Sequence, residues 1–198
     1  ATISRELPIV MRPDDSDPEN VQLYTSNVFR YPWAENAYLA FPAAYFLYRG
    51  AQLKDRALNG NDGTFDVQLA VSHDGIHWDR QRQAWIQPDY LDGVQLQLVS
   101  MGTGMIRRGR ELHQYFVGWP HTHGRPVVWD RDLINRKEWL KRDRGGIYCA
   151  TSRLDGFVSM DAGNLPGTLT TNPLVVTGSQ LKLNIDVSGT GIATVAIL

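Results

Sequence analysis

The sequence predicts an all-β fold in which antiparallel sheets recur along the chain. The clearest unit is Phe65–Trp78, where apolar residues alternate with small or polar ones at the strand period of two before an Asp74-Gly75 turn. Asp can bond its own backbone and Gly tolerates positive φ, so this dipeptide favours a tight turn, and Trp78 begins the return. A weaker copy follows at Ile147–Val158, with its own Asp155-Gly156 turn.

Each of these units follows a pair of apolar strands, in Ala37–Tyr48 and in Met105–Trp119. Sheets that recur in this way suggest the blades of a β-propeller, because a single blade cannot bury both of its faces. We expect a partial β-propeller of about two to three four-stranded antiparallel blades over residues 1–163.

The strands of the first half follow from their apolar patterns. Short strands are expected at Val21–Tyr24 and Val28–Tyr31. The Tyr38–Tyr48 strand is apolar on both faces, which is typical of a strand buried between neighbours, and Pro42 indicates a bulge in it. Further on, Arg108–Arg110 is expected to turn a hairpin.

The last part of the chain, residues 164–198, changes character and is expected to begin a β-sandwich. Three strands are predicted there, at Leu169–Val176, Gln180–Val187 and Ile192–Leu198. The middle one alternates strictly between apolar and polar residues, as in a half-exposed antiparallel sheet. Because the last residues are an apolar strand, we also expect the chain to be a fragment of a longer protein.

Composition and charge exclude some classes of function. The 198 residues carry a net charge of −1, which argues against a surface for nucleic acid or for an anionic membrane. The locally basic run from Arg136 to Arg144 is interpreted as a solvated loop. No stretch reaches the length of a membrane span, and no signal peptide pattern opens the chain.

Cysteine and aromatic content give weaker indications. The single Cys149 forms no internal disulfide, and its place in an apolar strand predicts an inert, buried thiol, so the redox chemistry does not fix the compartment. The chain has six Trp and eight Tyr. Such rings can stack on the C–H faces of sugars, or they can fill an all-β core.

Several segments together resemble one known group of proteins. They are Asp17–Tyr24, Phe29–Trp33, Tyr38–Pro42, Asp66–Trp78 and Arg153–Ser159. These segments are similar to the later portion of bacterial proteins of the glycoside hydrolase family 32 and 43 type. The resemblance implies a five-bladed propeller, often followed by a β-sandwich, of which the first two or so blades are missing here. It also implies a carbohydrate ligand and a secreted or periplasmic location.

The resemblance also implies catalytic carboxylates near the propeller axis. Glycoside cleavage needs an acid of raised pKa opposite an ionised carboxylate, and only an acid from a later blade could lie in this chain. Glu35, beside Trp33, is the candidate for that acid, and the alternative is a surface Glu on a loop. Asp66 is a second candidate, and the alternative is a residue that pairs with a turn or an Arg.

Aromatic and imidazole side chains are candidates for contacts with a sugar. His121 and His123 have the i, i+2 spacing that places two imidazoles on one side of an extended chain. The sequence shows no third metal ligand, so a polar loop that contacts substrate or solvent is favoured, and neither a metal nor a cofactor is expected. The candidate substrate-binding residues are Tyr31, Trp33, Trp119, His121 and His123.

Three functions remain open from the sequence. The first is a glycoside hydrolase, or a fragment of one, that uses carboxylate acid/base chemistry. The second is a carbohydrate-binding module without catalysis. The third is a structural β-module that forms an oligomer or associates with the missing part of a propeller, since open sheet edges favour such pairing.

Overall fold

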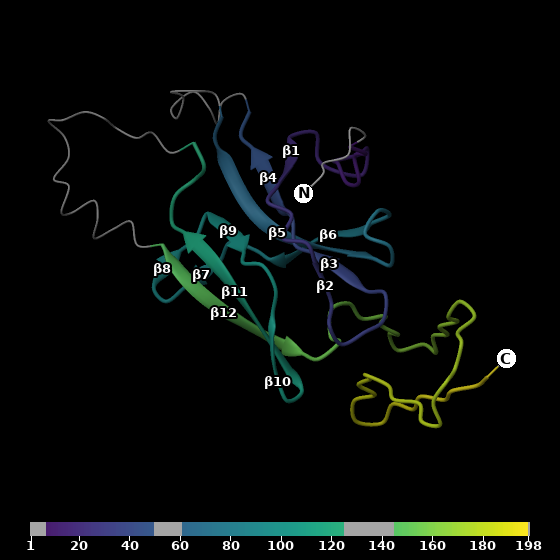
Figure 1. Ribbon diagram of the computed structural model, residues 1–198. Helices are drawn as coiled ribbons and strands as arrows, with labels where there is room; N and C mark the ends of the chain where they lie inside the picture. The colour runs from purple at the N-terminus through teal and green to yellow at the C-terminus, as the bar shows by residue number, and fades with distance from the viewer. Residues whose placement is uncertain (1–6, 50–60, 125–144, 198) are drawn as a thin grey trace, which may run out of the picture. The chain divides into compact units, whose positions relative to one another are not determined.

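The computed structural model shows an all-β protein, as the sequence predicted (Figure 1). The structure describes residues 7–49, 61–124 and 145–197, and within them it has twelve strands and no helix. The basic run from Arg136 to Arg144 lies outside the described residues. The strands are β1 (Val21–Tyr24), β2 (Phe29–Arg30), β3 (Tyr38–Ala40), β4 (Ala43–Leu47), β5 (Gly63–Ser72), β6 (Asp79–Ile86), β7 (Tyr90–Leu91), β8 (Val94–Gln95), β9 (Leu98–Met101), β10 (Ile106–Arg108), β11 (Glu111–Trp119) and β12 (Gly146–Arg153).

Strand β5 is the centre of the first sheet region. On one edge, β3 and β4 pair with it antiparallel in a single register that runs from the Tyr38↔Ser72 pair to the Leu47↔Gly63 pair. On the other edge, β5 pairs antiparallel with β6. Since β1 pairs with β4 and β2 pairs with β3, residues 21–30, 38–47, 63–72 and 79–86 form an antiparallel meander.

Phe41 and Pro42 separate β3 from β4 without changing the register with β5. Proline has no N–H to donate to a ladder, so the ladder is interrupted there, but the unshifted register shows that the predicted bulge is absent. The Pro42 carbonyl still accepts a hydrogen bond from the Gln68 N–H, at 2.9 Å. Around this point Ala40, Phe41 and Ala43 have no exposed surface, which confirms that the strand is buried on both faces.

The turn after β5 is held by side chains of its own sequence. Asp74 Oδ1 accepts hydrogen bonds from the N–H groups of Ile76 and His77, each at 2.8 Å, and Gly75 adopts a φ of 76°. The indole Nε1 of Trp78 donates to the Gly75 carbonyl at 3.2 Å. The predicted sequence of strand, Asp-Gly turn and returning Trp is therefore confirmed.

The second sheet region is built around β11. Strand β9 pairs antiparallel with it, for example through Phe116↔Met101, and both β10 and β12 also pair with β11. The predicted hairpin turn is confirmed, with Gly109 at a φ of 62° between β10 and β11. One parallel pair, Phe65↔Leu98, joins the two regions into a ten-stranded mixed sheet.

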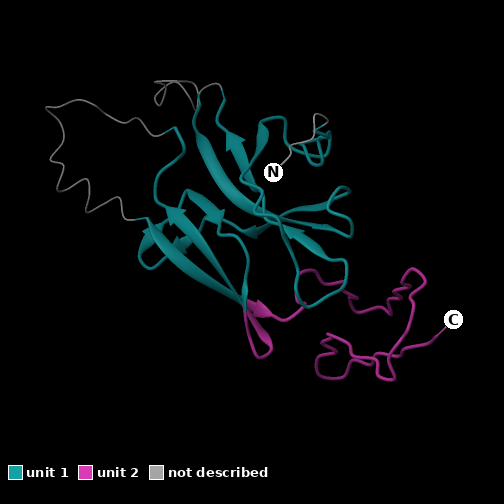
Figure 2. Cartoon of the chain, viewed as in Figure 1, with its two compact units in different colours: residues 1–106, 113–151 teal, residues 107–112, 152–198 magenta. Residues whose placement is uncertain are grey.

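The chain divides into two compact units (Figure 2). Unit 1 comprises residues 1–106 and 113–151, and unit 2 comprises residues 107–112 and 152–198. The proposed boundary between residues 163 and 164 stays a prediction.

The strands predicted at the end of the chain are absent from residues 154–197 of the structure, and this corrects the prediction. Those residues form turns and irregular segments instead. Leu181, Leu183 and Ile185, which alternate as in a strand, are all more than half exposed. An alternating segment forms a stable strand only where a neighbour completes its hydrogen bonds and covers its apolar face, and residues 154–197 pair with no strand of the described chain.

The prediction of a buried thiol is also wrong, because Cys149 is exposed on β12. Its neighbour on the same face, Ile147, is 76% exposed. The apolar residues of this strand suggested that it is buried. In the structure one face of β12 is half-buried and the other is exposed. The Cys149 sulfur lies 3.6 Å from Nδ1 of His113 on β11.

A buried ion pair joins the N-terminal segment to β6. Arg80 donates to the Asp17 carboxylate, and the side chains of both residues are at most 5% exposed. Nearby, Nη2 of Arg82 donates to both carboxylate oxygens of Asp14, at 2.7 and 2.6 Å, and the side chains of this pair are 37% and 54% exposed.

We predict that Asp17→Asn destabilises the protein by about 3 kcal/mol, because it leaves the buried Arg80 charge without compensation. Chemical denaturation measures this loss. The matched change Asp14→Asn removes a carboxylate from the exposed pair and should cost much less, because solvent screens that pair. Equal losses for the two variants would contradict a special role for the buried pair.

Candidate functional site

The two predicted catalytic carboxyl groups, of Glu35 and Asp66, lie near opposite ends of β5. Glu35 is exposed in the turn between β2 and β3. The next residue, Asn36, has its carbonyl 2.9 Å from Nδ1 of His73, just beyond the end of β5. Glu35 therefore belongs to the end of the sheet where β5 finishes.

Asp66 lies near the other end of the same strand. Seven residues of nearly extended chain separate Asp66 from His73, which corresponds to roughly 20 Å at the rise of a β-strand. Paired carboxyl groups in glycosidases are about 5–10 Å apart. The structure does not bring Glu35 and Asp66 together as a catalytic pair.

Asp66 is nevertheless an unusual carboxyl group. Its Oδ1 atom is buried and has no hydrogen-bond partner among the described residues. Burial raises the pKa of Asp66 from its ordinary 3.8 to about 7, although the nearby Arg80 charge acts in the opposite direction. Asp66 is therefore largely protonated in mildly acidic solution, and its carboxyl group can donate a proton.

Arg80 organises the polar groups on this side of β5. Its Nη1 donates to Oε1 of Gln68 at 2.6 Å, while its Nη2 donates to Asp17. Burial opposes the ionisation of Asp17, but the hydrogen bond from Arg80 and the positive charges of Arg80 and Arg82 outweigh it, and the pKa of Asp17 is lowered. Asp17 and Asp66, which both interact with Arg80, are thus held in opposite protonation states near pH 6.

On the opposite side of β5, four rings form what we call the aromatic cluster: Tyr24, Tyr45, Phe65 and His123. Tyr45 of β4 is directly opposite Phe65 of β5, with ring centroids 4.9 Å apart. The imidazole of His123 lies 4.8 Å from the Tyr45 ring and 5.4 Å from the Phe65 ring. Tyr24 of β1 completes the cluster, 5.3 Å from both Tyr45 and Phe65.

The backbone holds His123 against these strands. The His123 N–H donates to the Gly63 carbonyl at 2.9 Å. The buried Asp62 accepts hydrogen bonds through Oδ1 from the N–H groups of Gly63 and Gly124, each at 2.8 Å. A Cβ atom on Gly124 would collide with the Asn61 carbonyl, so this close approach requires glycine.

Tyr45 forms the buried base of the aromatic cluster. Its side chain has no exposed surface, and its hydroxyl donates to Oδ1 of Asn61 at 2.9 Å. Burial, with a smaller contribution from the Asp62 charge, raises the pKa of Tyr45 to about 12. By contrast, Tyr24 and Phe65 are half-buried and His123 is exposed, so these three rings present surface to the solvent.

The remaining predicted residues fall into two groups. Tyr31 is buried and contacts the half-buried Trp33 edge to face, with ring centroids 5.2 Å apart, in the loop between β2 and β3. Trp119 ends β11, and His121 and His123 follow it on the same segment. Of the five predicted binding residues, only His123 belongs to the aromatic cluster.

Tyr24, Tyr45 and Phe65 were not among the site residues predicted from the sequence. Each lies inside a strand, where a ring is read first as core, and only the register between β1, β4 and β5 shows that the three are neighbours. Two features of the sequence pointed to these rings. Tyr45 lies in a strand that was predicted as buried, and Phe65 begins the predicted unit that contains β5.

No group of three or more His, Cys, Asp or Glu side chains in the described part of the chain could hold a metal ion. None of the described residues forms a helix long and apolar enough to cross a membrane.

Comparison with known proteins assigns no family. No protein-family model, no curated protein and no solved structure matches this chain.

We predict that Asp66→Asn raises the melting temperature by at least about 3 °C at pH 8.5 and leaves it unchanged at pH 4. Between pH 4 and 7 the folded protein holds a proton on Asp66 that the unfolded chain releases. Stability therefore falls as pH rises through this window, and the cost is complete above pH 7. An asparagine at position 66 stays neutral at every pH, so the variant does not lose this stability.

The control for this experiment is Asp15→Asn, a change at an exposed aspartate. Its melting temperature should follow that of the wild type at both pH values. A melting temperature of Asp66→Asn that does not exceed the wild type at pH 8.5 would show that the Asp66 carboxylate is accommodated without cost.

Proposed function

We propose that this protein is carbohydrate-active and that its described part binds a saccharide on the aromatic cluster. The observation that carries the proposal is the partly exposed surface of Tyr24, Phe65 and His123 over the buried Tyr45 ring. Aromatic faces bind the C–H surfaces of sugar rings, and the imidazole nitrogens of His123 can exchange hydrogen bonds with sugar hydroxyl groups. The resemblance to glycoside hydrolases of families 32 and 43 points to the same ligand class.

Binding without cleavage agrees best with the positions of the carboxyl groups. Glu35 and Asp66 are too far apart to flank one glycosidic bond, as argued above from the length of β5. The aromatic cluster and Asp66 also lie on opposite faces of β5, since Phe65 and Asp66 are consecutive residues of a regular strand. A sugar on the rings would therefore not contact the Asp66 carboxyl group.

Glycoside hydrolysis is the second candidate, and one observation favours it. A pKa of about 7 suits Asp66 to the role of a general acid that protonates a leaving oxygen. Asp17, which is kept ionised by Arg80, would be the opposing carboxylate. Against this candidate, the Asp17 side chain is only 2% exposed and is occupied by its ion pair.

We also propose the finer architecture of a partial propeller followed by the start of a sandwich. The meander of residues 21–30, 38–47, 63–72 and 79–86 has the strand number and connectivity of one propeller blade. Strands β9, β10 and β12 all pair with β11, and an Asp155-Gly156 turn follows β12 as an Asp74-Gly75 turn follows β5. Residues 164–198 would join a sandwich sheet when partner strands are supplied.

Glycan binding tests the main proposal. We predict that His123→Ala and Phe65→Ala each weaken binding of the best glycan on an array by about tenfold or more, because each change removes one ring from the surface that the sugar covers, and a loss of about 1.4 kcal/mol is tenfold in affinity. Tyr115→Ala, at an exposed ring on β11, is the matched control and should bind as the wild type does. Unchanged binding by His123→Ala would exclude the aromatic cluster.

Hydrolysis is tested separately with aryl glycosides. If the protein is a glycoside hydrolase, Asp66→Asn removes turnover. Glu35→Gln retains turnover, because Glu35 lies in an exposed turn near the other end of β5 from Asp66. Loss of turnover in Glu35→Gln alone would restore the original assignment of the acid. Absence of turnover in the wild type, together with retained glycan binding, supports the binding function.

A further inference from the structure

The loop that follows β1 lies against the end of β9 through side chains from both segments. Oγ1 of Thr25 is 3.4 Å from Oγ of Ser100 on β9, although the two residues are 75 positions apart in the sequence. Asn27 is bound at both ends of its amide. Its Nδ2 donates to the Met101 carbonyl at 2.7 Å, and its Oδ1 accepts from the Thr103 hydroxyl at 3.1 Å. These contacts gather four polar, uncharged side chains in one place.

The loop is fixed in an unfavourable backbone conformation. Thr25 has a φ of 22° and Asn27 a φ of 43°. For a β-branched residue such as Thr a positive φ is rare, and it persists only where the surrounding structure imposes it. Here the Ala43 N–H donates to the Thr25 carbonyl at 3.4 Å, and the Phe41 N–H donates to the Ser26 carbonyl at 2.9 Å. The Thr25 hydroxyl is therefore placed against Ser100 without the help of a ligand.

The hydroxyl groups of Thr25 and Ser100 are not committed to each other. Hydrogen bonds between hydroxyl groups are about 2.5–3.0 Å long, so a separation of 3.4 Å is a weak contact. Neither side chain makes another hydrogen bond to a described residue, and each hydroxyl can donate one hydrogen bond and accept two. Thr25 is exposed and Ser100 is half-buried. Two adjacent hydroxyl groups are thus available to a molecule from solution.

This hydroxyl pair lies beside the aromatic cluster. Thr25 directly follows Tyr24, one of the four rings. Ser100 lies two residues after Leu98, which pairs with Phe65, so the side chains of Ser100 and Phe65 project on the same side of the sheet. With strands about 4.8 Å apart and a rise of about 3.3 Å per residue, the Cα atoms of Phe65 and Ser100 are roughly 8 Å apart. The rings and the hydroxyl pair are therefore within reach of one ligand.

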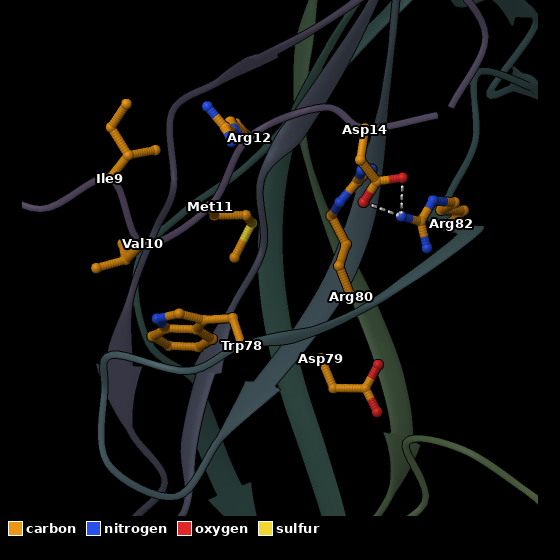
Figure 3. Close-up of a pocket in the computed structure, with 9 residues that line it drawn as sticks. All are labelled: Ile9, Val10, Met11, Arg12, Asp14, Trp78, Asp79, Arg80 and Arg82. Carbon is orange, nitrogen blue, oxygen red and sulfur yellow. Dashed lines mark hydrogen bonds and ion pairs between the residues drawn. The ribbon is translucent and has the colours of Figure 1, made fainter. Parts of the chain in front are cut away.

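The cavity of about 400 Å³ drawn in Figure 3 does not extend the aromatic cluster. It lies between residues 9–14 and 78–82, and its lining includes Arg80, on the opposite side of β5 from the rings. Arg80 and Arg82 are each paired with an aspartate of the same chain. A ligand that covers the rings continues toward the end of β9 and not into this cavity.

We propose that Thr25 and Ser100 form a hydroxyl-binding subsite beside the aromatic cluster, and that the ligand is a neutral oligosaccharide of at least two sugar units. This inference rests on the proposed function, in which the cluster binds a saccharide. One unit covers the exposed rings, and the hydroxyl groups of the next unit exchange hydrogen bonds with Thr25 and Ser100. The ligand is neutral because the four side chains of the subsite carry no charge. Asn27, with both ends of its amide bound, is a positioning residue.

Isothermal titration of the whole chain tests the length of the ligand. The probes are xylose, xylobiose and xylotriose, and glucose, cellobiose and cellotriose. In at least one series we expect the disaccharide to bind about tenfold more tightly than the monosaccharide, because two additional hydrogen bonds of about 0.5–1.5 kcal/mol each become possible. Equal affinities for monosaccharide and disaccharide in both series would overturn the inference, and so would the absence of binding in both.

Variants locate the subsite. Ser100→Ala should weaken disaccharide binding by about threefold or more and leave monosaccharide binding unchanged. Thr151→Ala, which removes a hydroxyl from an exposed position on β12, is the matched control and should bind both probes as the wild type does. Thr25→Ser keeps the hydroxyl and should retain disaccharide binding, whereas Thr25→Gly should weaken it. Because glycine accepts a positive φ, the melting temperature of Thr25→Gly should stay close to that of the wild type.

Phe65→Ala separates this inference from the proposed function. The change removes a ring of the cluster, so it should weaken monosaccharide and disaccharide binding alike. Disaccharide binding that depends on Phe65 but is unchanged in Ser100→Ala and Thr25→Gly would overturn the subsite and leave the proposed function standing. Disaccharide binding that is unchanged in Phe65→Ala would exclude the aromatic cluster and the subsite with it.

Discussion

Hydrogen bonding on both edges of β5 is the constraint on which the described structure depends. The strand is held in one continuous register by β3 and β4, so its side chains cannot shift by a residue without exchanging faces, while the pairing with β6 on the other edge shifts register on both sides of Gln68. Phe65 and Asp66 are therefore committed to opposite sides. One side gathers rings from β1, β4 and β5, and the other gathers the polar groups around Arg80.

The polar side illustrates how one cation can serve several purposes. The Arg80 guanidinium binds Gln68 and Asp17, fastens the N-terminal segment to the sheet and reduces the cost of ionising nearby carboxyl groups. It donates to Oδ2 of Asp17 but makes no hydrogen bond to Asp66, which keeps a proton to near-neutral pH. Arg80 thus takes part both in the buried ion pair with Asp17 and in the surroundings of Asp66.

Prediction from the sequence succeeded where the information was local. The Asp74-Gly75 turn and the hairpin at Gly109 each depend on the backbone preferences of a few residues, and both are present. The bulge predicted at Pro42 is absent, because the strand is only interrupted there and keeps its register with β5. The prediction failed where burial had to be inferred from apolar residue types alone. Cys149 is exposed and residues 169–197 form no strand, because covering a face requires a neighbour that the local pattern does not specify.

The sequence by itself determined the all-β class, most strands of the first meander and the Asp74-Gly75 turn, because alternation and turn chemistry act over short distances. Only the tertiary structure decided which side chains meet. Tyr24, Tyr45, Phe65 and His123 are far apart in the chain and become neighbours through strand register, while Glu35 and Asp66 are separated by the length of β5. The meeting of distant side chains depends on pairing geometry, which no single stretch of sequence contains.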